Sequence, residues 1–250
     1  MLRVRKSRPR IDLPTSRVRA SITNVVQRGN RRLNPAYRET IYQASYFELA
    51  GRATWLQDIP LSSPSGGTAS FSQLYLLLSI LNRAQPRRLL ELGVGQSSKL
   101  LDQYAREHAA SVVHIDEDAA WLRDSIVEDA SVSGVLAPLV PTQVESRHIE
   151  WYGCPRPHER FDLLLVDGPV AFSRAHRFNR LGVLAWVPEV LQDEFAIIVD
   201  DSTRKGERAL IASILQTLHA AGIAVVVGEI VGATSQVIIA SASYASFTYL

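Results

Sequence analysis

Short apolar runs alternate with helical segments along most of the chain, and no other feature restricts the fold as strongly. The runs read RRLLEL, SVVHI, FDLLLV, FAIIVD, IAVVVG and SQVIIA. Segments with helical spacing of apolar residues lie between them, at residues 97–108, 118–129 and 181–191 and before Gly222. Apolar strands that alternate with amphipathic helices are typical of a mainly parallel sheet covered on both faces. The sequence therefore predicts an α/β fold with a doubly wound sheet.

A third strand is expected between residues 136 and 154, where the pattern is weakest. Residues 139–144 are the best candidate. Pro138 and Pro141 would confine that strand to an edge of the sheet, because proline has no N–H to donate. Together with the six apolar runs, this strand gives a Rossmann-like, mostly parallel seven-stranded sheet.

The segment before the sheet also has helical patterns. An apolar stripe runs from Tyr42 to Leu56 at spacings of four and three residues, and a second helix is expected over residues 71–81. We expect a basic, flexible N-terminal arm at residues 1–33 and a helical extension or cap at residues 34–68. A single ligand-binding domain would then fill residues 69–250.

The charge is distributed unevenly along the chain. Residues 1–32 contain ten Lys or Arg and one acid, whereas the remaining 218 residues contain 17 basic and 24 acidic residues. A basic arm can contact nucleic acid, an anionic membrane surface or an acidic partner. Because this arm lacks interleaved aromatic residues, we favour a solvated tail and disfavour nucleic acid as a partner. An organelle presequence is also rich in arginine, but Pro9 and Pro14 interrupt a helix here.

No transmembrane segment is expected, although residues 209–228 are 20 residues without Asp, Glu, Lys or Arg. Leu210 and Ile214 have helical spacing and a β-branched run follows Gly222, so a helix, a glycine cap and a strand explain this stretch better. A single cysteine, Cys154, excludes an internal disulfide and favours a reducing compartment. We therefore expect a cytoplasmic protein, and the sequence leaves open whether it forms a homo-oligomer.

A glycine-containing turn, ELGVGQSS, directly follows the first apolar run. Gly93 and Gly95 allow a sharp turn and a close approach of ligand to backbone, and the next helix offers free N–H groups. The turn is not the dinucleotide fingerprint, since Ser98 stands where the third glycine is expected. Glu91 beside the glycines favours a ligand with a cationic ammonium or sulfonium group over a pyrophosphate.

Acidic residues also follow the second apolar run. A carboxylate at Asp116 can accept both hydroxyls of a ribose, as in other nucleoside-binding sheets. Asp118 is better explained as the N-cap of the next helix. Glu91 and Asp116 could each be a solvated acid, but together, at this spacing, they favour a bound nucleoside.

Four segments resemble the successive motifs of class I S-adenosylmethionine-dependent methyltransferases: LLELGVGQSSKLL, VVHIDEDAAWL, FDLLLVDGP and IIVDDSTRKGE. The resemblance covers residues 74–240 and is nearest to small O-methyltransferase-like enzymes with VDGP and DDxxR motifs. It implies that the cofactor is S-adenosylmethionine, with Gly93 and Gly95 around its methionine part. Glu91 would lie near its amino group and Asp116 would hold its ribose. Further cofactor contacts are expected from Ser97, Glu117 and Asp167. The resemblance also places the first strand between the second and the fourth.

Asp167 and the pair Asp200 and Asp201 follow apolar strands, so they lie at the carboxyl ends where open α/β sheets bind ligands. If the fourth and fifth strands are neighbours, as the resemblance implies, these carboxylates converge and cannot all stay ionised without compensation. Three alternatives would compensate the charge. A hard cation could bind the carboxylates, Arg204 could pair with them, or one acid could have a raised pKa and act as a base.

Asp167, Asp200 and Asp201 are therefore candidate ligands of Mg²⁺ or another divalent cation. The resemblance extends to metal-dependent O-methyltransferases, which have an Asp-Asn pair after the fifth strand and a lysine base three residues after the Asp of the fourth. Asp201 stands in place of that Asn and Val170 in place of that lysine. Both departures weaken the metal interpretation.

The expected acceptor is the oxygen of a small molecule or glycan. A hydroxyl acceptor needs a cation or a base for its proton, and Asp167, Asp200 and His176 are the candidates. A surface histidine on a basic loop is the plainer interpretation of His176.

The segment after VDGP contains Arg174, Arg177 and Arg180, which either solvate a helix face or favour an anionic acceptor. Trp151 and Tyr152 could stack on a sugar or an adenine, and core packing explains them equally well.

Two other functions stay open. A nucleic-acid methyltransferase is supported by the basic arm alone, and its affinity would fall steeply with salt. A nucleoside-binding module without turnover would keep the donor pocket, although the intact acidic cluster argues against it. A nicotinamide oxidoreductase ranks last because the third glycine is missing.

Overall fold

The computed structural model describes residues 35–57 and 69–250. The predicted basic arm at residues 1–33 and residues 58–68 of the predicted helical extension lie outside the described residues. The chain divides into two compact units at residue 35, and the second unit, Ala36–Leu250, is the one described below.

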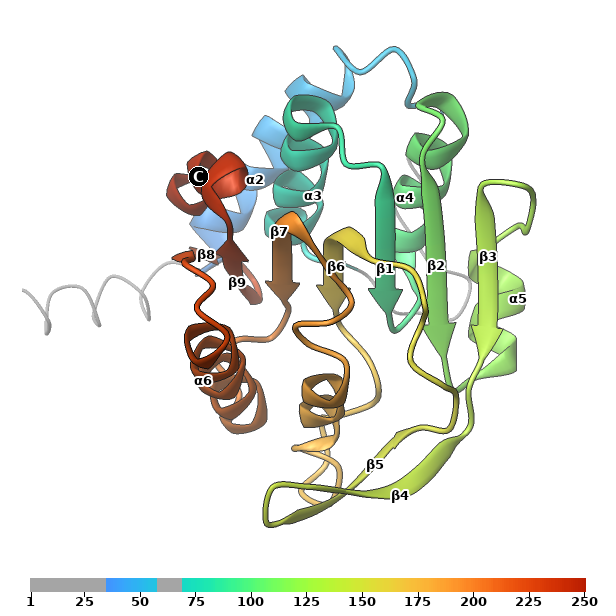
Figure 1. The fold of residues 1–250 in the computed structure, drawn as a ribbon. Coiled ribbons are helices and arrows are strands. Elements are labelled where there is room, and N and C mark those ends of the chain that lie inside the picture. Colours follow the sequence, from blue (N-terminus) through green and yellow to red (C-terminus); the bar gives the residue numbers. More distant parts are fainter. Residues whose placement is uncertain (1–34, 58–68) are drawn as a thin grey trace, which may run out of the picture. The chain divides into compact units, whose positions relative to one another are not determined.

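One seven-stranded sheet forms the centre of this unit, with the strand order β3-β2-β1-β6-β7-β9-β8 (Figure 1). The strands are β1 (Arg88–Leu92), β2 (Ser111–Asp116), β3 (Val132–Leu136), β6 (Phe161–Val166), β7 (Leu191–Val199), β8 (Val226–Val231) and β9 (Ser235–Ala240). All neighbouring pairs from β3 to β7 are parallel, and β9 runs antiparallel to both β7 and β8. This confirms the predicted doubly wound, mostly parallel sheet, with β1 between β2 and β6.

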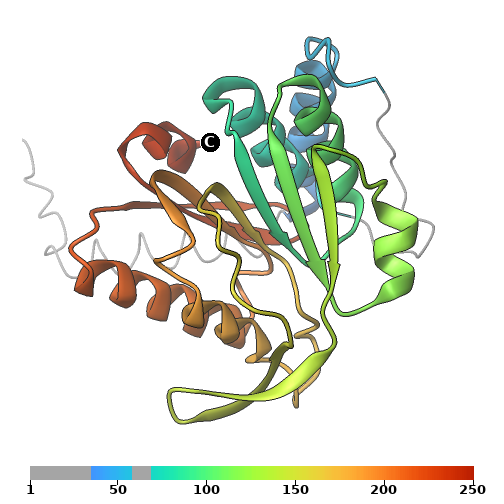
Figure 2. The same cartoon turned by 45° about the vertical axis from the view of Figure 1, so that its right-hand side comes forward.

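Helices cover both faces of the sheet (Figure 2). On one face lie α2 (Pro35–Ala50), α3 (Phe71–Ala84), α4 (Gln96–Glu107), α5 (Ala119–Ser125) and the 3₁₀ segment η2 (Ala242–Tyr249). On the other lie the 3₁₀ segment η1 (Asn179–Ala185) and α6 (Lys205–Ala220). Strand β6 shows why its sequence is a continuous apolar run: Leu163 and Leu165 belong to the first core, while Leu164 and Val166 belong to the second.

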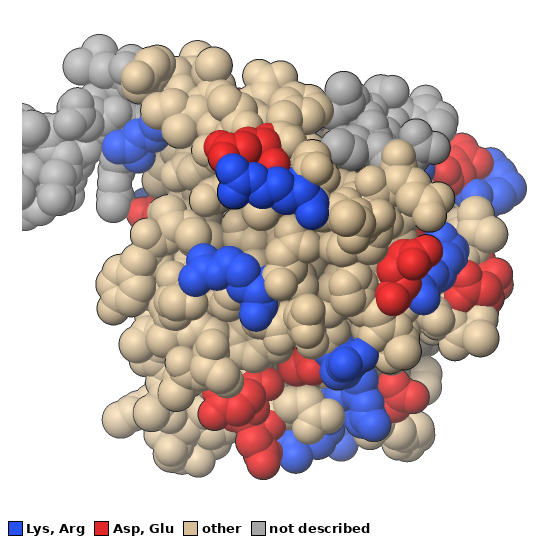
Figure 3. All heavy atoms as spheres, turned by 90° about the horizontal axis from the view of Figure 1, so that it is seen from above, with Lys and Arg blue, Asp and Glu red and all other residues tan. Residues whose placement is uncertain are grey.

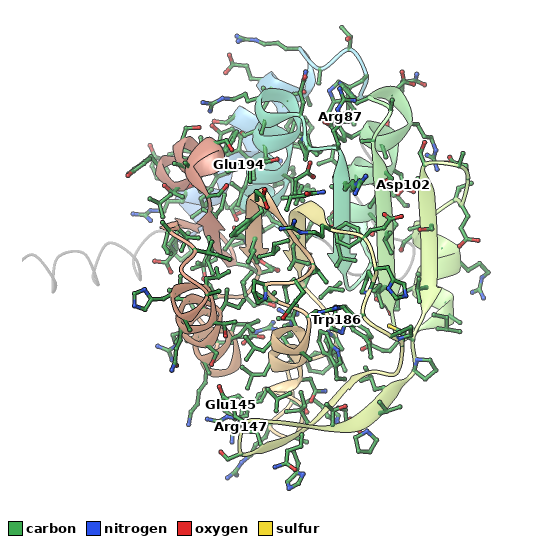
Figure 4. All side chains as sticks on the ribbon, viewed as in Figure 1. Arg87, Asp102, Glu145, Arg147, Trp186 and Glu194 are labelled. Carbon is green, nitrogen blue, oxygen red and sulfur yellow. The ribbon has the colours of Figure 1, made fainter. Side chains whose placement is uncertain are left out.

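The third strand was placed wrongly by the sequence pattern. Strand β3 is Val132–Leu136, whose Ser and Gly residues mask its apolar pattern. Residues 139–144 do form a strand, β4 (Leu139–Val144), but it pairs antiparallel with β5 (Arg147–Tyr152) in a separate two-stranded sheet. Glu145 and Arg147 mark the tip of this hairpin in Figure 4. A polar hairpin explains the two prolines better than an edge strand of the main sheet.

Four other predictions need correction. Helix α2 ends at Ala50, so the apolar stripe predicted to run to Leu56 continues into turns, and α5 ends at Ser125 rather than near Asp129.

Residues 181–191 also do not form one helix, because η1 ends at Ala185 and turns lead to β7. The strand after Gly222 begins at Val226 rather than at Ile223. The uncharged stretch is otherwise as expected, since α6 ends before Gly222, which has a φ of 74°. Among the helices of residues 35–57 and 69–250, none has the length and apolar character needed to cross a membrane.

The two glycines of the turn after β1 have different structural roles. Gly93 has a φ of 87°, and a Cβ added there would lie 2.5 Å from the backbone nitrogen of Gly168. The backbones at the ends of β1 and β6 therefore touch at this point. A Cβ added to Gly95 would have no atom within 4 Å.

We expect Gly93→Ala to lower the free energy of unfolding by roughly 2 kcal/mol or more, because it adds strain at positive φ and a steric clash. Gly95→Ala should stay within about 0.5 kcal/mol of the wild type. Denaturant unfolding of both variants tests this, and equal losses of stability would contradict the assigned roles.

Candidate functional site

The candidate site lies at the carboxyl ends of β2, β1, β6 and β7, the lower edge of the sheet in Figure 1. Polar side chains meet at this edge because each of these parallel strands ends there. Three structural groups make up the site: the turn after β1, a buried network beneath it, and a cluster of acids after β6 and β7.

The carboxylate of Asp116 holds the turn in place. One oxygen accepts the N–H of Val94 at 2.8 Å, and the other accepts the N–H of Asp118 at 2.7 Å. Burial raises the pKa of Asp116 to about 6, although these two N–H donors act in the opposite direction. An ionised carboxylate offers about four acceptor positions, so Asp116 can still accept ribose hydroxyls.

Glu117 and Asp118 have separate roles. Glu117 accepts the N–H of Val170 at 3.0 Å, which joins the turn after β2 to the segment after β6. Asp118 is the N-cap of α5, as predicted, with its side chain accepting the N–H groups of Ala120 and Trp121.

Glu91 is fully buried beneath the turn instead of lining a cavity. Its two oxygens accept the hydroxyls of Ser97 and Ser98, each at 2.5 Å, and the Nδ1–H of His114 at 2.6 Å. The other ring nitrogen of His114 donates to Asp102 at 2.8 Å. The structure therefore does not bring the Glu91 carboxylate to a ligand, and it places Ser97 beside that carboxylate at the start of α4.

His114 carries a positive charge inside this network. Burial lowers its pKa, but the hydrogen bonds to Asp102 and Glu91 outweigh that effect and raise it to about 9. An imidazolium between two carboxylates fixes the orientation of both, and Asp102 lies on α4 (Figure 4). Sequence analysis missed His114 and Asp102, because a histidine within a strand gives no sign of its partners.

Asp167, Asp200 and Asp201 converge as predicted. One carboxylate oxygen from each lies within 4.8 Å of the others. Oxygen ligands of Ca²⁺ or Mg²⁺ lie about 2.0–2.6 Å from the ion, so these separations are compatible with a shared cation.

A buried arginine compensates much of the acidic charge. The guanidinium of Arg180, 5% exposed, lies 3.1 Å from an oxygen of Asp167, 3.7 Å from Asp201 and 3.5 Å from Glu207. Arg204 pairs with Asp201 at 2.6 Å. Pairing with Arg204 was one of the three alternatives that the sequence left open. Arg180 agrees with neither of its two interpretations, because it is not solvated and not free for an anionic acceptor. Its pairing with Glu207, 27 positions away, has no signal in the sequence.

Asp200 has no cationic side chain against it among the described residues. Its carboxylate accepts the amide N–H of Gln236 at 2.7 Å and the hydroxyl of Thr234 at 3.4 Å. Burial, together with the charges of Asp167 and Asp201, raises the pKa of Asp200 to about 8, although the hydrogen bond from Gln236 acts in the opposite direction. Asp200 therefore holds a proton near neutral pH.

A cavity of about 160 Å³ opens between the turn and the acidic cluster. The residues that line it are Ala69, Ser70, Gln73, Val94, Gly95, Gln96, Ser97, Trp121, Asp167, Asp200 and Thr234. Two carboxylates and no cationic side chain appear among them. Ligand sites typically span about 300–1,000 Å³, so this cavity accommodates one part of a ligand rather than all of it.

His176 is not brought to this cavity. Its ring lies 3.2 Å from a carboxylate oxygen of Glu150 and 3.1 Å from the hydroxyl of Ser173, and its side chain is 40% exposed. The plainer interpretation, a surface histidine, agrees with this position.

Trp151 and Tyr152 are buried in the second core, where Trp151 packs edge-on against Trp186, with 5.2 Å between the ring centroids. Of their two interpretations, core packing agrees with the structure. Arg174 is exposed, and Arg177 lies over the ring of Phe178.

Comparisons with known proteins give distant structural matches. No model of a protein family and no curated protein matches the chain. The cofactor-bound protein Rv0187 from MTB is 18% identical with a TM-score of 0.44, and the match covers 80% of this chain and 88% of that one. A methyltransferase from Pyrococcus furiosus is 16% identical with a TM-score of 0.46, covering 79% and 96%.

A form of CmcI with Mg and SAM is 15% identical with a TM-score of 0.43, covering 74% of this chain and 79% of that one. Every one of these TM-scores is below 0.5. The fold of this chain is therefore assigned from its own strand order and register.

Proposed function

We propose that this protein is an S-adenosylmethionine-dependent methyltransferase that methylates an oxygen of a small molecule or glycan. The observation that carries the proposal is the position of Asp116 and the glycine turn on adjacent parallel strands, next to a cavity lined by Asp167 and Asp200. Asp116 both fixes the turn and keeps acceptor positions for a ribose.

The charge of the cavity supports a cationic donor. Asp167 and Asp200 face it, and no Lys or Arg of the described residues lines it, so the cavity favours a sulfonium or ammonium group over a pyrophosphate. A cation bound there would also favour the ionised form of Asp200. Because a dinucleotide such as NAD carries a pyrophosphate, the same lining disfavours it. The donor supplies an activated methyl group, which leaves the protein to orient the two reactants and exclude water.

Asp200 is the proposed proton acceptor for a hydroxyl. It is buried, faces the cavity and is held by Gln236, so its carboxyl group is oriented toward a bound acceptor. With a pKa of about 8, it needs only a modest change in surroundings to lose its proton and accept another. Asp167 faces the same cavity and is the proposed contact for the cationic end of the donor. His176 has no proposed role because it lies away from this cavity.

A divalent cation is the alternative way to ionise Asp200. The three carboxylates offer oxygen ligands at suitable separations, but Arg180 and Arg204 already contact two of them. Asp167, Asp200 and Asp201 would hold the ion, which would lower the pKa of an acceptor hydroxyl.

A nucleic-acid acceptor is supported by the basic arm alone. Figure 3 shows the molecule from above, which is the end of the sheet opposite the candidate site. On the face seen in Figure 3, Lys and Arg side chains lie beside Asp and Glu, and the drawn residues of that face form no continuous basic surface. The predicted arm, which carries the excess of arginine, lies outside the described residues.

S-adenosylhomocysteine should raise the melting temperature of the protein. NAD should not, because it carries a pyrophosphate that the acidic lining of the cavity disfavours. Asp116→Ala should abolish the shift by removing the ribose acceptor and loosening the turn. Asp193→Ala, at a side chain 92% exposed, is the control that should keep it. Differential scanning fluorimetry tests this, and stabilisation by NAD alone would overturn the proposed donor.

The stability of the protein should depend on pH through Asp200. Its pKa is about 8 in the folded protein against an ordinary 3.8, so the folded state keeps a proton that the unfolded state releases. The free energy of unfolding therefore falls as pH rises from about 4 to 8, by an amount on the order of a few kcal/mol.

Asp200→Asn removes this proton equilibrium, so its stability relative to the wild type should grow between pH 5 and 8. His114 acts mainly between about 6.5 and 9, and equally in both proteins. Denaturant unfolding at several pH values measures the difference, and a constant offset would contradict the raised pKa.

Turnover should depend on Asp200 while donor binding does not. With a methyl-labelled donor and a panel of hydroxyl-bearing small molecules and glycans, the wild type should label at least one acceptor. Asp200→Asn should bind S-adenosylhomocysteine normally but lower the rate by roughly 100-fold or more. EDTA distinguishes a role of Asp200 as a cation ligand from a role as a base. If EDTA abolishes activity and Mg²⁺ restores it, a cation takes part; if activity is unchanged, Asp200 acts as the base. If Asp200→Asn keeps full activity, the cluster is structural.

A further inference from the structure

Gln73 is a buried residue whose amide group has no hydrogen-bond partner among the described residues. It lies in the first turn of α3, its side chain is 0% exposed, and neither its amide nitrogen nor its amide oxygen makes a hydrogen bond. A buried amide without partners destabilises a folded protein, so native structures normally satisfy such groups. Because Gln73 lines the cavity, a ligand there can supply the missing partners.

The start of α4 lies beside Gln73. The N–H of Ala69, two residues before α3, donates to the side chain of Gln96 at 3.0 Å, which joins the beginnings of the two helices. Gln96 and Ser97 also line the cavity. Helix α4 has 12 residues, and the first N–H groups of such a helix favour an anionic group such as a carboxylate.

The amino group of a ligand in this cavity would need a carboxylate other than Glu91, the residue that sequence analysis suggested. Glu91 was expected to lie near that group, but its oxygens are occupied by Ser97, Ser98 and His114. Asp167 is the carboxylate that faces the cavity at the end of β6, next to β1. The cavity thus combines a carboxylate, a helix start and a free amide.

We propose that Gln73 binds the amino-acid end of the donor and makes the site select nucleosides that carry this end. The amide oxygen would accept from the ammonium group and the amide N–H would donate to the carboxylate. Asp167 would add a second contact to the ammonium, and the start of α4 a second contact to the carboxylate. The assignment rests on the proposed function.

The strand order agrees with this arrangement. Asp116, at the end of β2, does not line the cavity, whereas Val94 and Asp167, after β1 and β6, do. Neighbouring strands lie about 4.8 Å apart, so a nucleoside held by its ribose at Asp116 is long enough to reach past β1 to the cavity that Gln73 lines.

Calorimetric titration with two ligands tests the role of Gln73. S-adenosylhomocysteine carries the amino-acid end, and 5′-methylthioadenosine has the same nucleoside without it. Gln73→Leu should weaken the binding of S-adenosylhomocysteine by roughly 10- to 100-fold and leave that of 5′-methylthioadenosine within about twofold. The melting temperature of the unliganded variant should equal or exceed that of the wild type, because an unpartnered amide is removed.

Ser125→Ala is the matched control, since the Ser125 hydroxyl is also buried without a partner but lies outside the cavity. It should bind both ligands like the wild type. Equal weakening of both ligands by Gln73→Leu would show a structural role and overturn the assignment, as would no weakening of either. If the wild type binds neither ligand, the proposed donor itself is wrong.

Discussion

The buried guanidinium of Arg180 is the interaction on which the candidate site depends. It contacts Asp167, Asp201 and Glu207, and it donates to the backbone carbonyl of Asp200. The ends of β6 and β7 and the start of α6 are therefore held by one cation. Removing it would leave buried carboxylates without compensation, a change that typically costs several kcal/mol. The acidic edge of the sheet exists because this arginine is there.

The two arginines compensate only part of the negative charge of the acidic cluster, and this is why Asp200 is able to act as a base in the proposed reaction. Arg180 and Arg204 balance part of the charge, while Asp200 is held by neutral groups. Its proton is retained because burial and neighbouring carboxylates disfavour the ionised form. A cationic ligand in the adjacent cavity would shift this balance toward ionisation. Donor binding and the readiness of the proposed base are thus linked through one electrostatic field.

Sequence patterns predicted the sheet well because apolar periodicity is a local signal. Six of the seven main-sheet strands follow from apolar runs, and β3 was missed because Ser133 and Gly134 interrupt its pattern. The convergence of Asp167 and Asp200 was predictable, since parallel strands share their carboxyl edge.

Partners far apart in the chain were not predictable in the same way. The pairing of His114 with Glu91 and Asp102 depends on strand register and on the packing of α4, and neither leaves a pattern in composition or spacing. The same limit explains why the buried position of Glu91 was not predicted. A carboxylate beside the glycines indicates a charged environment, but the direction of its side chain is decided by the histidine on the next strand.

The buried network of Glu91, His114 and Asp102 also bears on how such a chain can diverge. Replacing His114 leaves two buried carboxylates without their shared cation, and replacing Glu91 or Asp102 leaves a ring N–H of His114 without its acceptor. Replacing all three by apolar residues is tolerable in energetic terms. Proteins in which only one or two of these residues are replaced should therefore be unstable, so the three residues should be kept together or replaced together. Correlated identities at these positions in a lineage would mark descent with this packing, even where the acceptor has changed.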